Sequence, residues 1–228
     1  MAPATRTEKD PLGPREVPAD ALYGVQTLRA TENFPISGLR QIPAFVLATV
    51  WIKKAAALTH KETGRLEPRL ADAIVRAADE IIAGQHRDQF VVDVFQAGAG
   101  TSHNMNVNEV LANRANELLG AKRGAYAPGH PNDHVNMAQS TNDVIPTAIR
   151  LACLAQLHPL VKAFTTMRDA LRKKGEEFDD IVKSGRTHLQ DAMPIRLGQE
   201  FHAYAGTIER GIRRVAEAAE YLRDLGIG

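Results

Sequence analysis

The chain has 228 residues, of which 44% are hydrophobic and 24% charged, and its formal net charge is +1. These values are typical of a soluble protein and give no general attraction for nucleic acid or a membrane surface. The single cysteine, Cys153, excludes an internal disulfide and a cysteine metal cluster, and we expect it to lie in the core. The N-terminus lacks the apolar core of a signal peptide, and no run of about 20 apolar residues is found. We therefore expect a cytoplasmic protein without a membrane span.

Aromatic residues make up only 5% of the chain, which favours helix packing over a β-sandwich. Residues 1–42 are rich in Pro, Gly and short polar residues, and they predict an extended arm with little regular structure. Two helices with apolar faces are predicted next, over 43–64 and 68–84, each opened by a proline and closed by a glycine.

A connection over 85–100 precedes a third predicted helix, 103–119. After a loop rich in Gly and Pro, one long helical pattern runs from Asp143 to about Lys174. With Asn142 as the N-cap, Pro146 would be the fourth helical residue and no helical hydrogen bond would be lost. Pro159 lies inside the pattern and predicts a kink.

A loop containing Gly185, Pro194 and Gly198 is predicted to lead into a last helix, from Ile195–Leu197 to Leu222 or Leu225. The chain is therefore predicted to be mainly α, with an N-terminal helical domain over 1–142 and two long bundle helices over 143–228. A helical bundle usually needs four or more helices, so these two would leave apolar stripes uncovered. We expect either that the chain oligomerises through these helices or that it is the front piece of a longer protein, whose missing half a partner could supply.

Hydroxyl groups gather at two predicted helix starts. Thr101 and Ser102 follow a glycine-rich stretch, and Ser140, Thr141 and Asn142 precede the long helix. Unpaired N–H groups and a partial positive charge make a helix start a site for anions, and adjacent hydroxyls strengthen it. Two such sites indicate a small acid with more than one carboxylate. The alternative is that these side chains are ordinary N-caps, which need no ligand.

Two histidine-containing segments are further candidates. Thr187 and His188 lie in the loop between the two long helices, where His188 could carry a proton or donate to a substrate, or could simply be exposed to solvent. The spacing of His130 and His134 does not match a helical zinc pair, and we expect no metal site there. His103 could support the site from behind or be solvated.

Several motifs together resemble those of the aspartase/fumarase superfamily, over essentially the whole chain. They are the stretches 15–34, 100–113, 131–136, 139–143 and 185–192. Within the superfamily the chain looks most like the aspartate ammonia-lyases. It reads Ala-Gly-Thr-Ser at 99–102 and Asn-Asp-His-Val at 132–135, where class II fumarases usually read Ser-Gly-Thr-Gln and Asn-Asp-Asp-Val.

The resemblance implies elimination of ammonia from L-aspartate to give fumarate, without an organic cofactor, in a homotetramer. It assigns the β-carboxylate to Thr101, Ser140 and Thr141, the amino group to Asn142 and His188, and the other carboxylate to Thr187. Ser102 belongs to the same motif. Activation by a divalent ion, known for some relatives, is not readable from the sequence.

The chain also departs from the family pattern. Family members are about twice as long, and the loop with their catalytic serine base has no counterpart in these 228 residues. We therefore expect an N-terminal portion that is inactive alone. The alternatives are a class II fumarate hydratase and, from another class, a non-catalytic interaction subunit.

Overall fold

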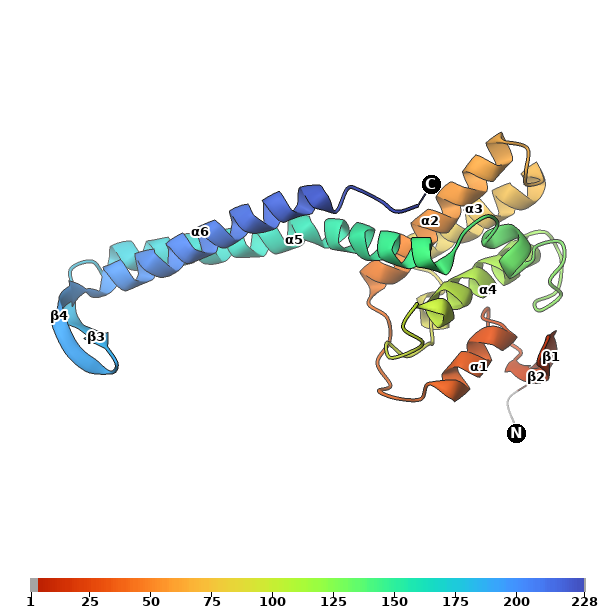
Figure 1. Cartoon of the computed structure of the whole chain (residues 1–228), viewed down its shortest axis with the longest axis horizontal. Coiled ribbons are helices and arrows are strands. Elements are labelled where there is room, and N and C mark those ends of the chain that lie inside the picture. The colour runs from red at the N-terminus through yellow and green to blue at the C-terminus, as the bar shows by residue number, and fades with distance from the viewer. Residues whose placement is uncertain (1–3, 228) are drawn as a thin grey trace. The chain divides into compact units, whose positions relative to one another are not determined.

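A computed structural model describes residues 4–227. The chain divides into two compact units, one formed by residues up to Ala152 together with those from Leu225, and the other by Cys153–Asp224. The mainly α fold is confirmed, and the elements are shown in Figure 1.

The N-terminal arm is more ordered than the sequence predicts. Strands β1 (Thr5–Asp10) and β2 (Gly13–Pro18) pair antiparallel, and helix α1 (Val25–Asn33) follows them. The prediction of little regular structure was wrong, because contacts with distant residues order this segment. The Glu109 carboxylate, for example, accepts the N–H groups of Gly24, Gln26 and Thr27 at the start of α1.

Three helices form the main core of the first unit. Helices α2 (Pro43–Glu62) and α3 (Pro68–Ile82) confirm the two predicted helices, and α4 (Thr101–Leu118) begins two residues before the predicted start. A short 3₁₀ helix, η1 (Arg87–Gln89), lies in the connection. The apolar stripe of α3 is buried against α2 and α4 because its alanines and isoleucines recur at helical spacing.

The long helix α5 (Thr141–Glu177) follows the short π-helix η2 (Pro131–Val135) and continues through Pro159. It begins earlier than predicted, since the Ser140 carbonyl already accepts the N–H of Val144. Pro146 is therefore the sixth helical residue rather than the fourth. Because proline has no N–H, the helical bond to the Asn142 carbonyl is not made.

The second unit contains the later part of α5 and the helix α6 (Leu197–Tyr221), which form a helical hairpin (Figure 1). The segment between them was predicted to be a loop, and this was wrong. It forms a β-hairpin of β3 (Val182–Thr187) and β4 (Gln190–Arg196). Its two-residue turn places His188 and Leu189 at φ values of 48° and 62°, as a type I′ turn requires.

The helical hairpin exposes apolar surface. A groove between α5 and α6 is lined by Leu157, Leu160, Val215 and Leu222, among others, and also by Cys153. Cys153 is exposed, so its predicted place in the core was wrong. Among the described residues, α5 is the one helix long and apolar enough to cross a membrane, by length and composition only, which the sequence analysis did not expect. Core helices of soluble proteins meet the same criterion.

Candidate functional site

The start of α4 is capped by backbone geometry instead of by a hydroxyl. Gly100 is the N-cap residue with φ of 75° and supplies no side-chain cap, while the Gln96 side-chain oxygen accepts the N–H of His103, the third helical residue, at 2.8 Å. Thr101 and Ser102 are the first two helical residues, and Thr101 is exposed. The alternative that they are ordinary N-caps is therefore wrong, and their hydroxyls remain available beside the N–H groups.

The start of α5 is different, because one of its hydroxyls does act as a cap. Ser140 Oγ accepts the Asn142 N–H at 3.2 Å, although its own proton is still available to a ligand. Thr141 and Asn142 are the first two helical residues, half-buried and exposed respectively. The start of α5 thus carries several polar side chains, as the sequence predicts, and Ser140 is one of them that caps the helix.

The tertiary structure brings these two helix starts together. A methyl group added to Gly100 would lie 2.8 Å from Ile145 Cγ1, in the second turn of α5. Asn104 in the first turn of α4 donates to Thr141 Oγ1 at 3.1 Å. The candidate site is therefore a surface where two positive helix ends and the hydroxyls of Thr101, Ser140 and Thr141 converge, which suits a carboxylate.

A buried polar layer supports this surface, and the sequence analysis missed it. Lys53 of α2 is fully buried, and its Nζ donates to Asn136 Oδ1 at 2.8 Å and to Gln139 Oε1 at 2.9 Å. Asn136 Oδ1 also accepts from Asn104 at 3.1 Å. Burial lowers the pKa of Lys53 to about 7. A lysine in an alanine-rich helix gives no signal in sequence, since most such lysines lie on the solvated face.

His103 belongs to the same layer and is buried, so its solvated alternative was wrong. Its Nε2 lies 2.9 Å from Thr49 Oγ1, and its ring stacks on Phe45. Burial, with a smaller effect of the nearby Lys53 charge, lowers the pKa of His103 to about 3. The imidazole is therefore neutral at physiological pH.

The remaining predicted residues lie elsewhere in the fold. Thr187 and His188 are exposed on the β-hairpin of the second unit, while the hydroxyls above belong to the first. His130 caps η2 through Nδ1, and its own N–H is accepted by His134 Nδ1 at 2.8 Å. Within residues 4–227 no group of three or more His, Cys, Asp or Glu side chains could hold a metal ion.

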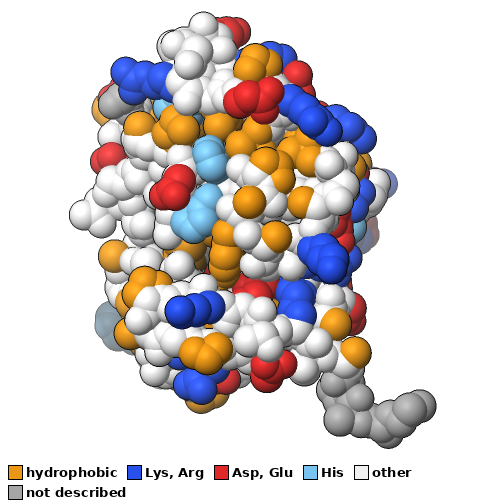
Figure 2. Space-filling model, turned by 90° about the vertical axis from the view of Figure 1, so that its right-hand side faces the viewer, with side chains coloured by type: hydrophobic (Ala, Val, Ile, Leu, Met, Phe, Trp, Pro, Cys, Tyr) orange, Lys and Arg blue, Asp and Glu red, His pale blue; other side chains and the backbone are white. Residues whose placement is uncertain are grey.

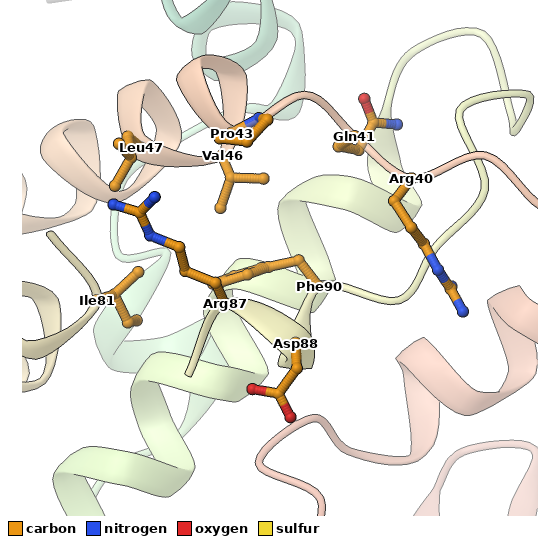
Figure 3. A pocket seen from close by; sticks show the side chains of 9 residues that line it. All are labelled: Arg40, Gln41, Pro43, Val46, Leu47, Ile81, Arg87, Asp88 and Phe90. Carbon is orange, nitrogen blue, oxygen red and sulfur yellow. The ribbon is translucent and has the colours of Figure 1, made fainter. Parts of the chain in front are cut away.

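The structure also has a cavity that is not lined by residues of the two helix starts. This cavity of about 230 Å³ lies between α2, α3 and η1, with an apolar floor of Val46, Ile81 and Phe90. Figure 3 shows the Arg87 side chain extending toward Leu47, and both residues line the cavity. The face in Figure 2 carries acidic, basic and hydrophobic side chains, with histidines near its centre.

Comparisons with known proteins give the family. The model of a family described as lyase matches residues 13–228. The chain belongs to this lyase family. It is 53% identical over 223 residues to an aspartate ammonia-lyase from Bacillus sp, covering 98% of this chain and 48% of that protein. It is 55% identical over 229 residues to a class II fumarate hydratase from Halobacterium salinarum, covering 100% of this chain and 48% of that protein.

Solved structures of lyases have the same fold. A fumarate lyase:delta crystallin from Brucella melitensis matches with a TM-score of 0.94 and 52% identity, over 97% of this chain and 52% of that one. A class II fumarase from Schistosoma mansoni matches with a TM-score of 0.91 and 37% identity, over 99% of this chain and 48% of that one. The lyase chain thus spans about half the length of the relatives it matches, and it is the N-terminal portion of the superfamily pattern.

Proposed function

We propose that this lyase acts as an aspartate ammonia-lyase once the rest of the family fold is supplied. The observation that carries the proposal is the convergence of the α4 and α5 starts, with Thr101, Ser140 and Thr141 presenting hydroxyls beside unpaired helical N–H groups. Such an arrangement suits a carboxylate that gains negative charge during reaction.

The chemistry follows from that charge. A base removes the C3 proton of L-aspartate, and the electron pair moves into the β-carboxylate as an aci-carboxylate. The pair then returns to form the C2–C3 double bond of fumarate as the C2–N bond breaks and ammonia leaves. Preorganised donors at the β-carboxylate stabilise the intermediate most, so Thr101, Ser140 and Thr141 would bind it. The reaction needs no organic cofactor.

The remaining contacts require more of the family's assembly. By resemblance, Asn142 and His188 contact the amino group, Thr187 contacts the second carboxylate, and the serine base comes from a loop outside these 228 residues. The family builds each site from three subunits of a tetramer. We therefore propose that this chain acts in such an oligomer, and that the exposed groove along α5 and α6 is covered there.

A class II fumarate hydratase is the second candidate, because 55% identity to such an enzyme is as high as the identity to aspartate ammonia-lyases. The local motifs favour aspartate. Residues 99–102 read Ala-Gly-Thr-Ser, and His134 stands where class II fumarases usually have a second Asp. Both candidates use the same carboxylate site and differ in whether ammonia or water leaves.

The deciding experiment uses complementation. The 228-residue chain is co-expressed with the C-terminal half of an aspartate ammonia-lyase, and the purified assembly is offered L-aspartate or L-malate while fumarate is measured by its ultraviolet absorbance. Fumarate from L-aspartate supports the proposal. Fumarate from L-malate alone would identify the hydratase, and turnover of neither would favour a non-catalytic subunit.

The role of the hydroxyls is tested in the same assembly. Thr101→Ala or Thr141→Ala should lower kcat on the order of 10²-fold, as loss of one oxyanion donor typically does. Thr166→Ala is the matched control, since this exposed threonine bonds only to the Lys162 carbonyl within α5. Equal turnover of all three variants would reduce Thr101 and Thr141 to structural residues.

A further inference from the structure

The buried amine of Lys53 is a feature of the site layer that the proposed function leaves unexplained. Its side chain has no exposed surface, and its Nζ donates to two neutral amide oxygens, Asn136 Oδ1 at 2.8 Å and Gln139 Oε1 at 2.9 Å. Amide oxygens satisfy the hydrogen bonds of an ammonium group without neutralising its charge.

A continuous path of hydrogen bonds joins this amine to the start of α5. Asn136 Oδ1 accepts from Asn104 Nδ2 as well as from Lys53, and Asn104 Nδ2 also donates to Thr141 Oγ1. Asn136 Nδ2 donates to the Gln139 carbonyl at 3.0 Å, which shapes the turn before Ser140. Since Thr141 Oγ1 accepts from Asn104, its own proton is free to point outward to a ligand.

Carboxylates on the surrounding elements bond to other groups, and the buried Glu109 of α4 accepts backbone N–H groups at the start of α1. On α3, Asp79 pairs with Lys54 and Asp72 pairs with Lys61, both at 2.5 Å. The η2 carboxylate, Asp133, is 74% exposed and faces His130.

The histidines of these elements supply no negative charge to the amine. His103 on α4 is neutral, His60 on α2 contacts the Met137 carbonyl, and His134 on η2 accepts the His130 N–H. Within residues 4–227, neither Lys53 nor Asp143 of α5 makes an ion pair with another side chain. Among the residues that the structure describes, the lysine behind the proposed anion site thus has no side-chain counter-ion within ion-pair distance.

A buried cation without a counter-ion is unstable relative to its neutral form, and burial lowers the pKa of Lys53 to about 7. A dianion bound at the two helix starts would supply the missing negative charge from the surface side. The opposite charge favours the ammonium form, so the ligand and the lysine proton should stabilise each other.

We infer that Lys53 is a positioning residue that orients Thr141 through Asn136 and Asn104, and that it takes up a proton when a dicarboxylate binds at the starts of α4 and α5. This inference rests on the proposed dicarboxylate site. Lys53 then contributes to the affinity for the dicarboxylate and to the pH dependence of its binding, although it does not contact the ligand.

The test is isothermal titration of succinate, an unreactive dicarboxylate, into the complemented assembly at pH 7.5. Titrations in two buffers with different ionisation enthalpies measure proton uptake directly. The wild-type assembly should take up a fraction of a proton per site, and Lys53→Met should abolish the uptake and weaken binding on the order of tenfold. Lys54→Met is the matched control, because this neighbouring lysine lies on the surface, paired with Asp79, and it should retain both values.

A second variant keeps the inference testable if Lys53→Met does not fold. Gln139→Glu places a carboxylate on the ammonium and so supplies a permanent counter-ion without emptying the site. It should remove proton uptake and weaken succinate binding, whereas a purely structural role for Lys53 would leave proton uptake unchanged.

The outcomes separate the two proposals. Turnover of L-aspartate without proton uptake in the wild-type assembly would overturn this inference and leave the proposed function standing. Proton uptake that depends on Lys53, with no turnover of either substrate, would support the inference for the binding site and refute the proposed function. Absence of succinate binding together with absence of turnover would overturn both.

Discussion

Replacing Gly100 with alanine tests whether the starts of α4 and α5 are in direct contact. The residue has φ of 75°, a left-handed conformation that disfavours side chains, and an added Cβ would lie 2.8 Å from Ile145 Cγ1 and 2.9 Å from Ile145 Cδ1. Two costs therefore add at one position. Gly64 offers a control for the first, since it has φ of 69° but nothing within 4 Å of an added Cβ.

The magnitude follows from these two terms. A left-handed non-glycine residue costs about 1–2 kcal/mol, and forcing a methyl group into a packed contact costs about 1–3 kcal/mol. Gly100→Ala should therefore lower the free energy of unfolding by about 2–5 kcal/mol, against about 1–2 kcal/mol for Gly64→Ala. Ile145→Ala removes the overlapping atoms, so the double variant with Gly100→Ala should recover the second term but keep the first.

Urea unfolding of the 228-residue chain measures these values. The single tryptophan, Trp51, lies in α2, so its fluorescence reports on the unit that contains both helix starts. Equal destabilisation by Gly100→Ala and Gly64→Ala would refute the contact between the two helix starts. A coupling energy of zero between positions 100 and 145 would refute it independently.

Three further predictions concern buried charges, each measured by urea unfolding. Glu109→Gln should lower the free energy of unfolding by about 1–3 kcal/mol, because its NH2 group would face backbone N–H groups that both carboxylate oxygens accept at the start of α1. No loss would contradict the role of Glu109 in ordering the arm. Burial lowers the pKa of Lys53 from 10.5 to about 7, so between pH 7 and pH 10.5 only the unfolded state binds that proton. The free energy of unfolding should therefore rise with pH over this range, by up to about 5 kcal/mol relative to Lys53→Met. A parallel pH dependence of the two proteins would refute this burial. Desolvation raises the pKa of Asp93, but hydrogen bonds from the N–H of Phe95, the Ser37 hydroxyl and other backbone N–H groups outweigh it and lower the pKa to about 2. The contribution of the Asp93 carboxylate to the free energy of unfolding should therefore be lost as pH falls below about 4. Asp93→Asn should lack this acid-sensitive part of the stability.

The sequence by itself determined the helices whose signals are local. Prolines 43 and 68 at helix starts, and apolar residues at helical spacing, were enough to predict α2 and α3. The clusters of hydroxyls were equally visible, because capping and anion binding use the same few residue types at helix starts. These properties depend on neighbours within one or two turns, which a sequence displays directly.

The tertiary structure decided the rest. Only the fold shows that Gly100, rather than Thr101, caps α4, and that the α4 and α5 starts meet through Asn104 and Thr141. The arm is ordered by Glu109, about 80 residues away along the chain, which no local pattern reveals. Lys53 is the clearest case. Lys53 is buried because its face of α2 packs against the turn before α5. Long-range packing decides which face of α2 is buried there, and the local helical pattern of the sequence does not show it.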